Sequence, residues 1–182
     1  ECLRRDPWRR PTADDVVAAA RRARAAQPAW SRRSFGERAA IFKRFHGLVL
    51  RRQDQLLDLI QLESGKARLH AFEEVLDTAI VARYYAHHAR EFLRPRRRKG
   101  AITLATKTIE FHHPVGVVGY IEPWNYPLNL GITDSIPALM AGNTAVLRPD
   151  VQTPFTALRA VSLLHEAGLP RDVMPVVTGP GR

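Results

Sequence analysis

The chain has 182 residues, of which 45% are hydrophobic and 25% are charged, and its net charge at neutral pH is +10. This is the composition of a folded globular protein with a core, not of a disordered segment. No apolar run approaches the roughly 20 residues of a membrane-spanning helix, and no apolar signal core follows the charged N-terminus. The single cysteine, Cys2, allows no internal disulfide. We therefore expect a cytoplasmic protein without membrane contact.

The positive charge indicates acidic partners such as nucleic acid, and its densest cluster is RPRRRKG at 94–100. The remaining arginines are interleaved with alanine, as on the outer face of amphipathic helices. No zinc-finger, aromatic-platform or glycine-clamp signature accompanies them. We interpret the charge as a solvated surface and expect no nucleic-acid partner, with an arginine-rich nucleic-acid binder as the alternative.

Helical patterns dominate the N-terminal part of the chain and predict four helices. Thr12, with Asp14 and Asp15 in the first turn after it, has the features of an N-cap for the first helix. A second helix begins at about Ser34 and carries an apolar stripe. The third ends at Gly65, a residue suited to the left-handed conformation, and the fourth ends before Pro95.

Period-two patterns replace the helical ones after residue 100. The segment AITLATKTIEFHH at 101–113 predicts a half-exposed ribbon. Three apolar runs then alternate with segments of helical length, a pattern typical of a parallel sheet buried on both faces. The runs lie at 115–121, 143–149 and 173–179. The predicted fold class is thus α/β, with N-terminal helices, a β-ribbon and the first half of a doubly wound, Rossmann-like parallel sheet.

These patterns divide the chain into three predicted parts. The parts are a helical region at 1–100, a β-ribbon at 101–114 and the first half of a dinucleotide-binding sheet at 115–182.

Two loops follow the first two predicted strands, EPWNYP and RPDVQTP, and both are expected at the edge of the sheet where ligands bind. Pro123 and Pro127 restrict the first loop and fix the course of Trp124 and Asn125 between them. An asparagine amide donates hydrogen bonds without carrying charge, as a preorganised oxyanion site requires. The alternative interpretation is a core tryptophan followed by a turn-forming asparagine.

No metal site is predicted. His112 and His113 lie in an alternating strand without a carboxylate or thiol at ligand spacing. Glu73 and Glu74 lie in the middle of the fourth helix, where the sequence predicts no catalytic role for them.

The motifs PVGVVGYIEPWNYPL, ALMAGNTAVLRPDVQTPFTAL and EAGLPRDVMPVVTGPG resemble consecutive motifs of the NAD(P)-dependent aldehyde dehydrogenases, most of all those of bacterial succinate-semialdehyde dehydrogenases. The resemblance extends from about residue 29 to 181. It implies an aldehyde substrate, NADP or NAD as cofactor, and a homo-oligomer in the full-length enzyme, to which the ribbon at 101–113 contributes.

The resemblance also implies roles for individual residues of the first loop. Asn125 matches the asparagine that donates to the substrate carbonyl oxygen and stabilises the oxyanion, so it is the catalytic candidate. The residues just before it match positions that line the cofactor cleft. They are Ile121, Glu122, Pro123 and Trp124.

In the second loop, Arg148 stands where the family usually has a ribose-binding lysine, with Asp150 two residues later. Arginine binds a phosphate in a fork, which favours the 2′-phosphate of NADP. Val151 stands where many members have a glutamate that discourages NADP, so its presence favours NADP as well. Gly179 and Gly181 match glycines that let the adenosine approach the backbone.

The sequence resembles only the N-terminal part of a family member, a truncated aldehyde dehydrogenase fold. The nucleophilic cysteine, the general-base glutamate and the catalytic domain have no counterpart in the 182 residues, because Cys2 matches no motif. We therefore expect the isolated chain to lack dehydrogenase activity. The alternative function is a non-catalytic oligomerisation or binding module.

Overall fold

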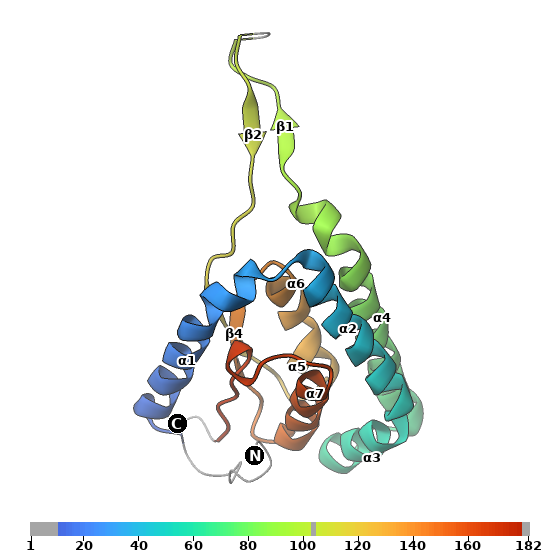
Figure 1. Cartoon of the computed structure of the whole chain (residues 1–182). Helices are drawn as coiled ribbons and strands as arrows, with labels where there is room; N and C mark the ends of the chain where they lie inside the picture. The colour runs from blue at the N-terminus through green and yellow to red at the C-terminus, as the bar shows by residue number, and fades with distance from the viewer. Residues whose placement is uncertain (1–10, 103–104, 180–182) are drawn as a thin grey trace.

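The computed structural model describes residues 11–102 and 105–179 of the chain. Four N-terminal helices pack around a small parallel sheet and the helices that follow its strands, while a ribbon projects away from this body (Figure 1). The four predicted N-terminal helices are confirmed. They are α1 (Ala13–Arg32), α2 (Phe35–Arg51), α3 (Gln53–Ser64) and α4 (Arg68–Leu93).

The helix starts follow from side chains that are close together in the sequence. Thr12 caps α1: its hydroxyl accepts from the Asp15 backbone N–H at 3.2 Å, and its own backbone N–H donates to the Asp15 carboxylate at 2.9 Å. Ser34 and Glu37 form the same reciprocal pair at the start of α2. At the end of α3, Gly65 has a φ of 70°, the left-handed conformation that a glycine adopts without strain.

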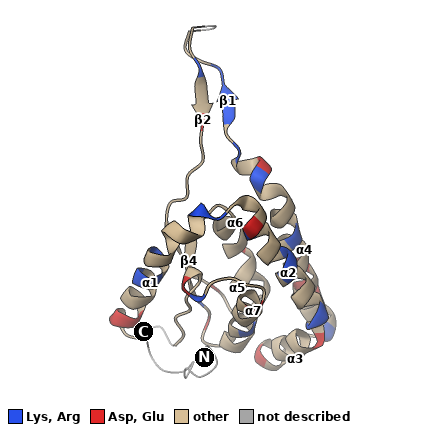
Figure 2. Cartoon of the chain, viewed as in Figure 1, with Lys and Arg blue, Asp and Glu red and all other residues tan. Residues whose placement is uncertain are grey.

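The ribbon begins earlier in the chain than its sequence pattern predicts. Strand β1 (Arg96–Arg98) pairs antiparallel with β2 (Thr108–Glu110), so the arginine cluster supplies one of the two strands. The guanidinium of Arg98 hydrogen-bonds the carboxylate of Glu110 across the pair, which lowers the pKa of that carboxyl. Figure 2 shows the basic residues spread over the outer helices and the ribbon, as the amphipathic patterns predict.

The sheet contains two parallel strands, β3 (Val117–Ile121) and β4 (Thr144–Arg148). The predicted third strand is reduced to a single parallel bridge between Leu147 and Val176, which places β4 between β3 and the Val176 segment. Pro175 explains the short ladder, because a proline has no N–H to donate to a neighbouring strand.

Three helices follow the strands of the sheet, and the second of them packs against β4, as α1 does. They are α5 (Asn129–Thr133), α6 (Ser135–Met140) and α7 (Pro154–Glu166). The sequence predicts one helix where α5 and α6 stand. Pro137 accounts for the break, since its missing N–H leaves the carbonyl of Thr133 without a helical donor.

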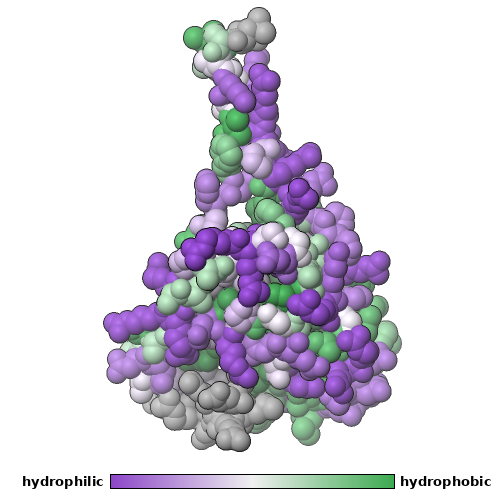
Figure 3. All heavy atoms as spheres, in the orientation of Figure 1, coloured by the Kyte–Doolittle hydropathy of each residue, from purple (hydrophilic) through white to green (hydrophobic). Residues whose placement is uncertain are grey.

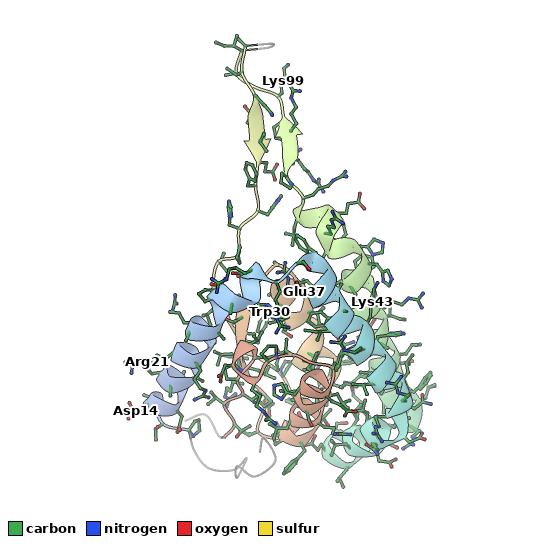
Figure 4. The ribbon with its side chains drawn as sticks, viewed as in Figure 1. Asp14, Arg21, Trp30, Glu37, Lys43 and Lys99 are labelled. Atoms are coloured by element: carbon green, nitrogen blue, oxygen red, sulfur yellow. The ribbon has the colours of Figure 1, made fainter. Side chains whose placement is uncertain are left out.

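One hydrophobic core joins the N-terminal helices to the sheet and its covering helices. Trp30, on α1, illustrates the junction: it is 1% exposed, points into the body in Figure 4, and donates its indole N–H to the carbonyl of Leu139 at 3.0 Å. The visible face of the body is mainly hydrophilic (Figure 3). Within 11–102 and 105–179, no helix has the length and apolar character needed to cross a membrane.

Candidate functional site

The two loops singled out in the sequence leave the sheet at the same edge. Ile121 and Arg148 are the last register pair of β3 and β4, and the next backbone N–H, that of Glu122, donates to the carbonyl of Arg148 at 3.0 Å. We call residues 122–128 the asparagine loop and residues 149–153 the arginine loop. Because the strands are parallel, both loops start at their carboxyl ends, where open α/β sheets bind ligands.

The asparagine loop presents its polar and aromatic side chains to solvent. Trp124 is 50% exposed, and Asn125 and Tyr126 are exposed as well, whereas Pro127 and Leu128 are buried. Among the described residues, none hydrogen-bonds the side-chain amide of Asn125. A core tryptophan and a self-satisfied turn asparagine are therefore not what the structure contains, and the amide is available to a ligand.

A buried carboxylate holds the downstream end of the asparagine loop. Glu74, on α4, is 1% exposed and accepts hydrogen bonds from the backbone N–H groups of Leu128 at 3.1 Å and Asn129 at 3.3 Å. Its other oxygen is paired with the ammonium of Lys66. That ammonium also lies 3.6 Å from the centre of the Tyr126 ring. The carboxylate thus satisfies N–H groups at the start of α5, which a helix cannot satisfy itself.

The first residue of the asparagine loop, Glu122, has a carboxyl group with a raised pKa. Glu122 is 7% exposed, and burial, together with the negative charge of Asp134, raises the pKa of its carboxyl to about 7. Burial also raises the pKa of the neighbouring Tyr120, with further contributions from Asp134 and Glu122. Around neutral pH this carboxyl is therefore protonated in a large fraction of molecules, so it adds less negative charge to the site than an ordinary glutamate would.

The arginine loop starts from a cation that reaches the neighbouring segment. The guanidinium of Arg148 donates to the carbonyl of Gly179 at 3.3 Å, and Gly179 has a φ of 131°, a conformation that favours glycine. Asp150 accepts from the backbone N–H of Gln152 at 2.8 Å, and Val151 is half-buried. The structure therefore brings Arg148 and Gly179 together. Gly181 lies outside the described residues.

A second carboxylate from the helical layer fixes the end of the arginine loop. Glu63, on α3, accepts hydrogen bonds from the backbone N–H groups of Phe155 at 2.7 Å and Thr156 at 2.6 Å, and from the hydroxyl of Thr156. These donors lie in the first turn of α7, where an anion is favoured by the free N–H groups and the helix dipole.

Comparison with known proteins gives this geometry a family. The model of the aldehyde dehydrogenase family matches residues 7–182. The chain belongs to the aldehyde dehydrogenase family.

Individual relatives agree with this assignment. A Mycolicibacterium smegmatis protein, whose name assigns it to the succinate-semialdehyde dehydrogenases that use NADP(+), is 54% identical over 170 residues, or 93% of this chain and 33% of that protein. An alpha-ketoglutarate semialdehyde dehydrogenase of Haloferax volcanii is 37% identical over 92% of this chain and 34% of its own length. The chain therefore spans about a third of the length of the curated relatives it matches.

Solved structures share the fold closely. The crystal structure of an E. coli NADP-dependent enzyme superposes with a TM-score of 0.88 at 36% identity, and covers 94% of this chain and 35% of that one. An NADP-dependent glyceraldehyde-3-phosphate dehydrogenase from Bacillus halodurans, solved in complex with NADP, gives a TM-score of 0.87 at 32% identity, with 93% and 36% covered. These matches confirm the predicted α/β class and its match to part of the aldehyde dehydrogenase fold.

In this aldehyde dehydrogenase chain, sequence reasoning missed the residues that hold the two loops. Lys66, Glu74 and Glu63 contact loop residues that are distant in the chain, and no local pattern distinguishes them from other charged residues of a helix. It also missed the 3.1 Å contact between His112 and Glu110 on the ribbon. Within the described parts of the chain, no group of three or more His, Cys, Asp or Glu residues forms a candidate metal site.

Proposed function

We propose that this chain is the cofactor-binding part of a dehydrogenase that oxidises an aldehyde, succinate semialdehyde, to the carboxylic acid with NADP or NAD. The observation that carries the proposal is the shared edge: the N–H of Glu122 bonds the carbonyl of Arg148, so the asparagine loop and the arginine loop start side by side. The 54% identity to the M. smegmatis protein supports the choice of substrate.

Asn125 is the residue proposed to act on the substrate. Its exposed amide donates to the carbonyl oxygen of the aldehyde, where negative charge develops when a thiolate attacks the carbon. A neutral donor suits this position because it stabilises the oxyanion without attracting a permanent counter-ion. Pro123 and Pro127 reduce the conformations available to the amide before the substrate binds.

The residues at the shared edge fit a dinucleotide. Arg148 supplies a positive charge, and Gly179 supplies a backbone segment without a side chain beside it. We assign the walls of the cofactor cleft to residues of this edge and the loops that leave it; they are Ile121, Glu122, Pro123, Trp124, Asp150 and Val151. Gly181, which lies outside the described residues, is assigned from its sequence motif alone. When bound, the nicotinamide ring accepts the hydride from the substrate.

Arg148 and Val151 support NADP over NAD. The planar guanidinium matches a phosphate with two parallel hydrogen bonds, and a valine brings no negative charge to repel the 2′-phosphate. Titration of the purified chain with each dinucleotide, followed by calorimetry, tests the assignment. We expect Arg148→Lys to weaken NADP binding about tenfold and NAD binding much less.

The matched control is Arg21→Lys, because Arg21 points outward from α1, away from the body (Figure 4). This variant is expected to bind both dinucleotides as the original chain does. Equal losses for NADP and NAD in Arg148→Lys would show that the guanidinium does not contact the 2′-phosphate. Failure of the original chain to bind either dinucleotide would refute the cofactor site itself.

We further propose that the 182-residue chain alone does not catalyse the oxidation. The reaction needs a thiolate nucleophile, and Cys2 is the single cysteine of the sequence, far from both loops in the chain and in no matching motif. Reduction of NADP at 340 nm with succinate semialdehyde is the measurement. Turnover that survives Cys2→Ser and disappears in Asn125→Ala would overturn this part of the proposal.

A second candidate function, subunit association, is favoured by the shape of the ribbon. Strands β1 and β2 extend away from the body in Figure 1, and Ile102, Ile109 and Phe111 are exposed on the ribbon. Exposed apolar side chains on a projecting ribbon are suited to a protein interface. Light scattering after size-exclusion chromatography tests this: we expect a dimer or larger species, and a monomer at all concentrations would exclude it.

A further inference from the structure

We propose that Lys66 and Glu74 are positioning residues that fix the asparagine loop and thereby orient the amide of Asn125. The inference rests on the role proposed above for Asn125. Its test reads the conformation of the loop directly, without activity, so a failure here is distinguishable from a failure of the proposed function.

The loop is held at both ends by hydrogen bonds from its backbone. Upstream, the N–H of Glu122 donates to the carbonyl of Arg148 on β4. Downstream, the N–H groups of Leu128 and Asn129 both donate to one oxygen of Glu74. A buried carboxylate that accepts from two backbone N–H groups holds them more strongly than a neutral acceptor would. These backbone hydrogen bonds fix the two ends of the loop, and the residues between them, Asn125 among them, need a further contact to fix their conformation.

Lys66 provides a contact to the middle of the loop. Its ammonium pairs with the second oxygen of Glu74 and lies 3.6 Å from the centre of the Tyr126 ring, so one cation contacts both the anchor and the residue that follows Asn125. Tyr126 is 43% exposed, and the cation–π contact restrains a ring that solvent would otherwise leave free. With Pro123 on the other side, Asn125 lies between two restrained residues.

The pair depends on both partners, because it is shielded from water. The side chain of Lys66 is 17% exposed and that of Glu74 is 0% exposed. Removal of either member leaves a charge in a site that water hardly reaches, and such a site rearranges or opens. Residues of α3–α4 junction and α4 thus control the loop through electrostatics, although they are not catalytic residues.

The test uses the tryptophan next to Asn125 as a probe. The chain has three tryptophans, so 5-fluorotryptophan labelling gives three ¹⁹F resonances, and Trp124→Phe assigns the one from the loop. In Lys66→Met we expect the Trp124 resonance to shift or broaden while that of the buried Trp30 stays in place. Lys66→Arg keeps the positive charge and is expected to restore the original resonance.

The matched control is Lys43→Met, since Lys43 is exposed on α2. It should leave both resonances unchanged. An unchanged Trp124 resonance in a folded Lys66→Met chain would overturn the proposal, as would an equal displacement of Trp124 and Trp30, which would indicate a general loss of packing.

Hydrogen exchange in the original chain provides a measurement that needs no variant. The backbone N–H groups of Leu128 and Asn129 are expected to exchange at least about tenfold more slowly than the backbone N–H of Asn125, because Glu74 accepts hydrogen bonds from both of them. Exchange of all three at one rate would show that the carboxylate does not anchor the loop, and would refute the proposal even if Lys66→Met failed to fold.

Discussion

The asparagine loop and the arginine loop leave the same edge of the sheet, but the helical layer holds them in different ways. The downstream end of the asparagine loop is bound by the carboxylate of Glu74, which is buried and paired with Lys66. The downstream end of the arginine loop is bound by Glu63, which is half-buried and accepts hydrogen bonds from the first turn of α7. Both glutamates satisfy free N–H groups at a helix start, yet only one of them is a member of a buried ion pair.

The difference concerns cost and rigidity. A half-buried carboxylate keeps some contact with water, so its loss removes little more than a cap. A fully buried carboxylate depends on its cation, and the two fail together. The loop that contains Asn125 is therefore held by a buried ion pair, whose disruption costs more stability than loss of the half-buried carboxylate that holds the loop after Arg148.

The largest expected effect is at Lys66. Lys66→Met leaves the carboxylate of Glu74 buried without its cation, and we expect the free energy of unfolding to fall by about 3 kcal/mol. Urea denaturation at pH 7 measures it, and Lys43→Met should change the value by less than about 0.5 kcal/mol. Similar losses of unfolding free energy in the two variants would mean that the Lys66–Glu74 ion pair contributes no more to stability than an exposed lysine does.

The next effect depends on pH and involves Glu122. Its carboxyl has a pKa of about 7 in the folded chain against 4.5 as the ordinary value, so folding favours the protonated form. This stability is fully present below pH 4.5, declines as the pH rises towards 7, and is lost above it.

Glu122→Gln removes this dependence. We expect the variant to be about 2 kcal/mol more stable than the original chain at pH 8 and equal to it near pH 4. Thermal or urea unfolding across this range measures the difference. A constant difference at every pH would show that the carboxyl titrates normally, and the asparagine loop would then begin at an ordinary charged residue.

A smaller effect is expected at Glu63. Glu63→Gln keeps the shape and one acceptor but removes the negative charge at the start of α7, which we expect to cost about 1 kcal/mol of unfolding free energy. The control is Glu166→Gln at the exposed end of the same helix, which should change stability by less than about 0.5 kcal/mol. A loss as large as that of Lys66→Met would erase the contrast between the two loops.

The smallest effect lies within the arginine loop. Asp150→Ala removes an acceptor for the N–H of Gln152 at an exposed turn, and we expect a loss of about 0.5 kcal/mol. Asp150→Asn keeps the acceptor oxygen and should be close to neutral. If both variants lose the same amount, the charge of Asp150 matters more than its hydrogen bond.

Much of the fold is predictable because its signals are local. Thr12 with Asp15 and Ser34 with Glu37 mark helix starts within three residues of chain, and Gly65 marks a helix end through its own conformation. The shared edge of the two loops is also predictable, since the carboxyl ends of parallel strands meet at one side of a sheet.

The failures have physical reasons that a local pattern does not contain. The arginine cluster at 94–100 is predicted as solvated surface of the helical region, but part of it forms β1, because β2 offers it a partner strand. The last apolar run reads as a full strand, but Pro175 and the neighbouring 3₁₀ turn at Arg171–Val173 leave it a single bridge to β4.

By itself, the sequence determined the four N-terminal helices, the two parallel strands β3 and β4, and the motifs that place the chain among aldehyde dehydrogenases. Only the tertiary structure decided which charged residues hold the site. Glu74 reaches Leu128 across 54 residues of chain, and Glu63 reaches Thr156 across 93. Contacts at such separations depend on how helices pack, because burial and pairing are properties of the assembled core and not of any single segment.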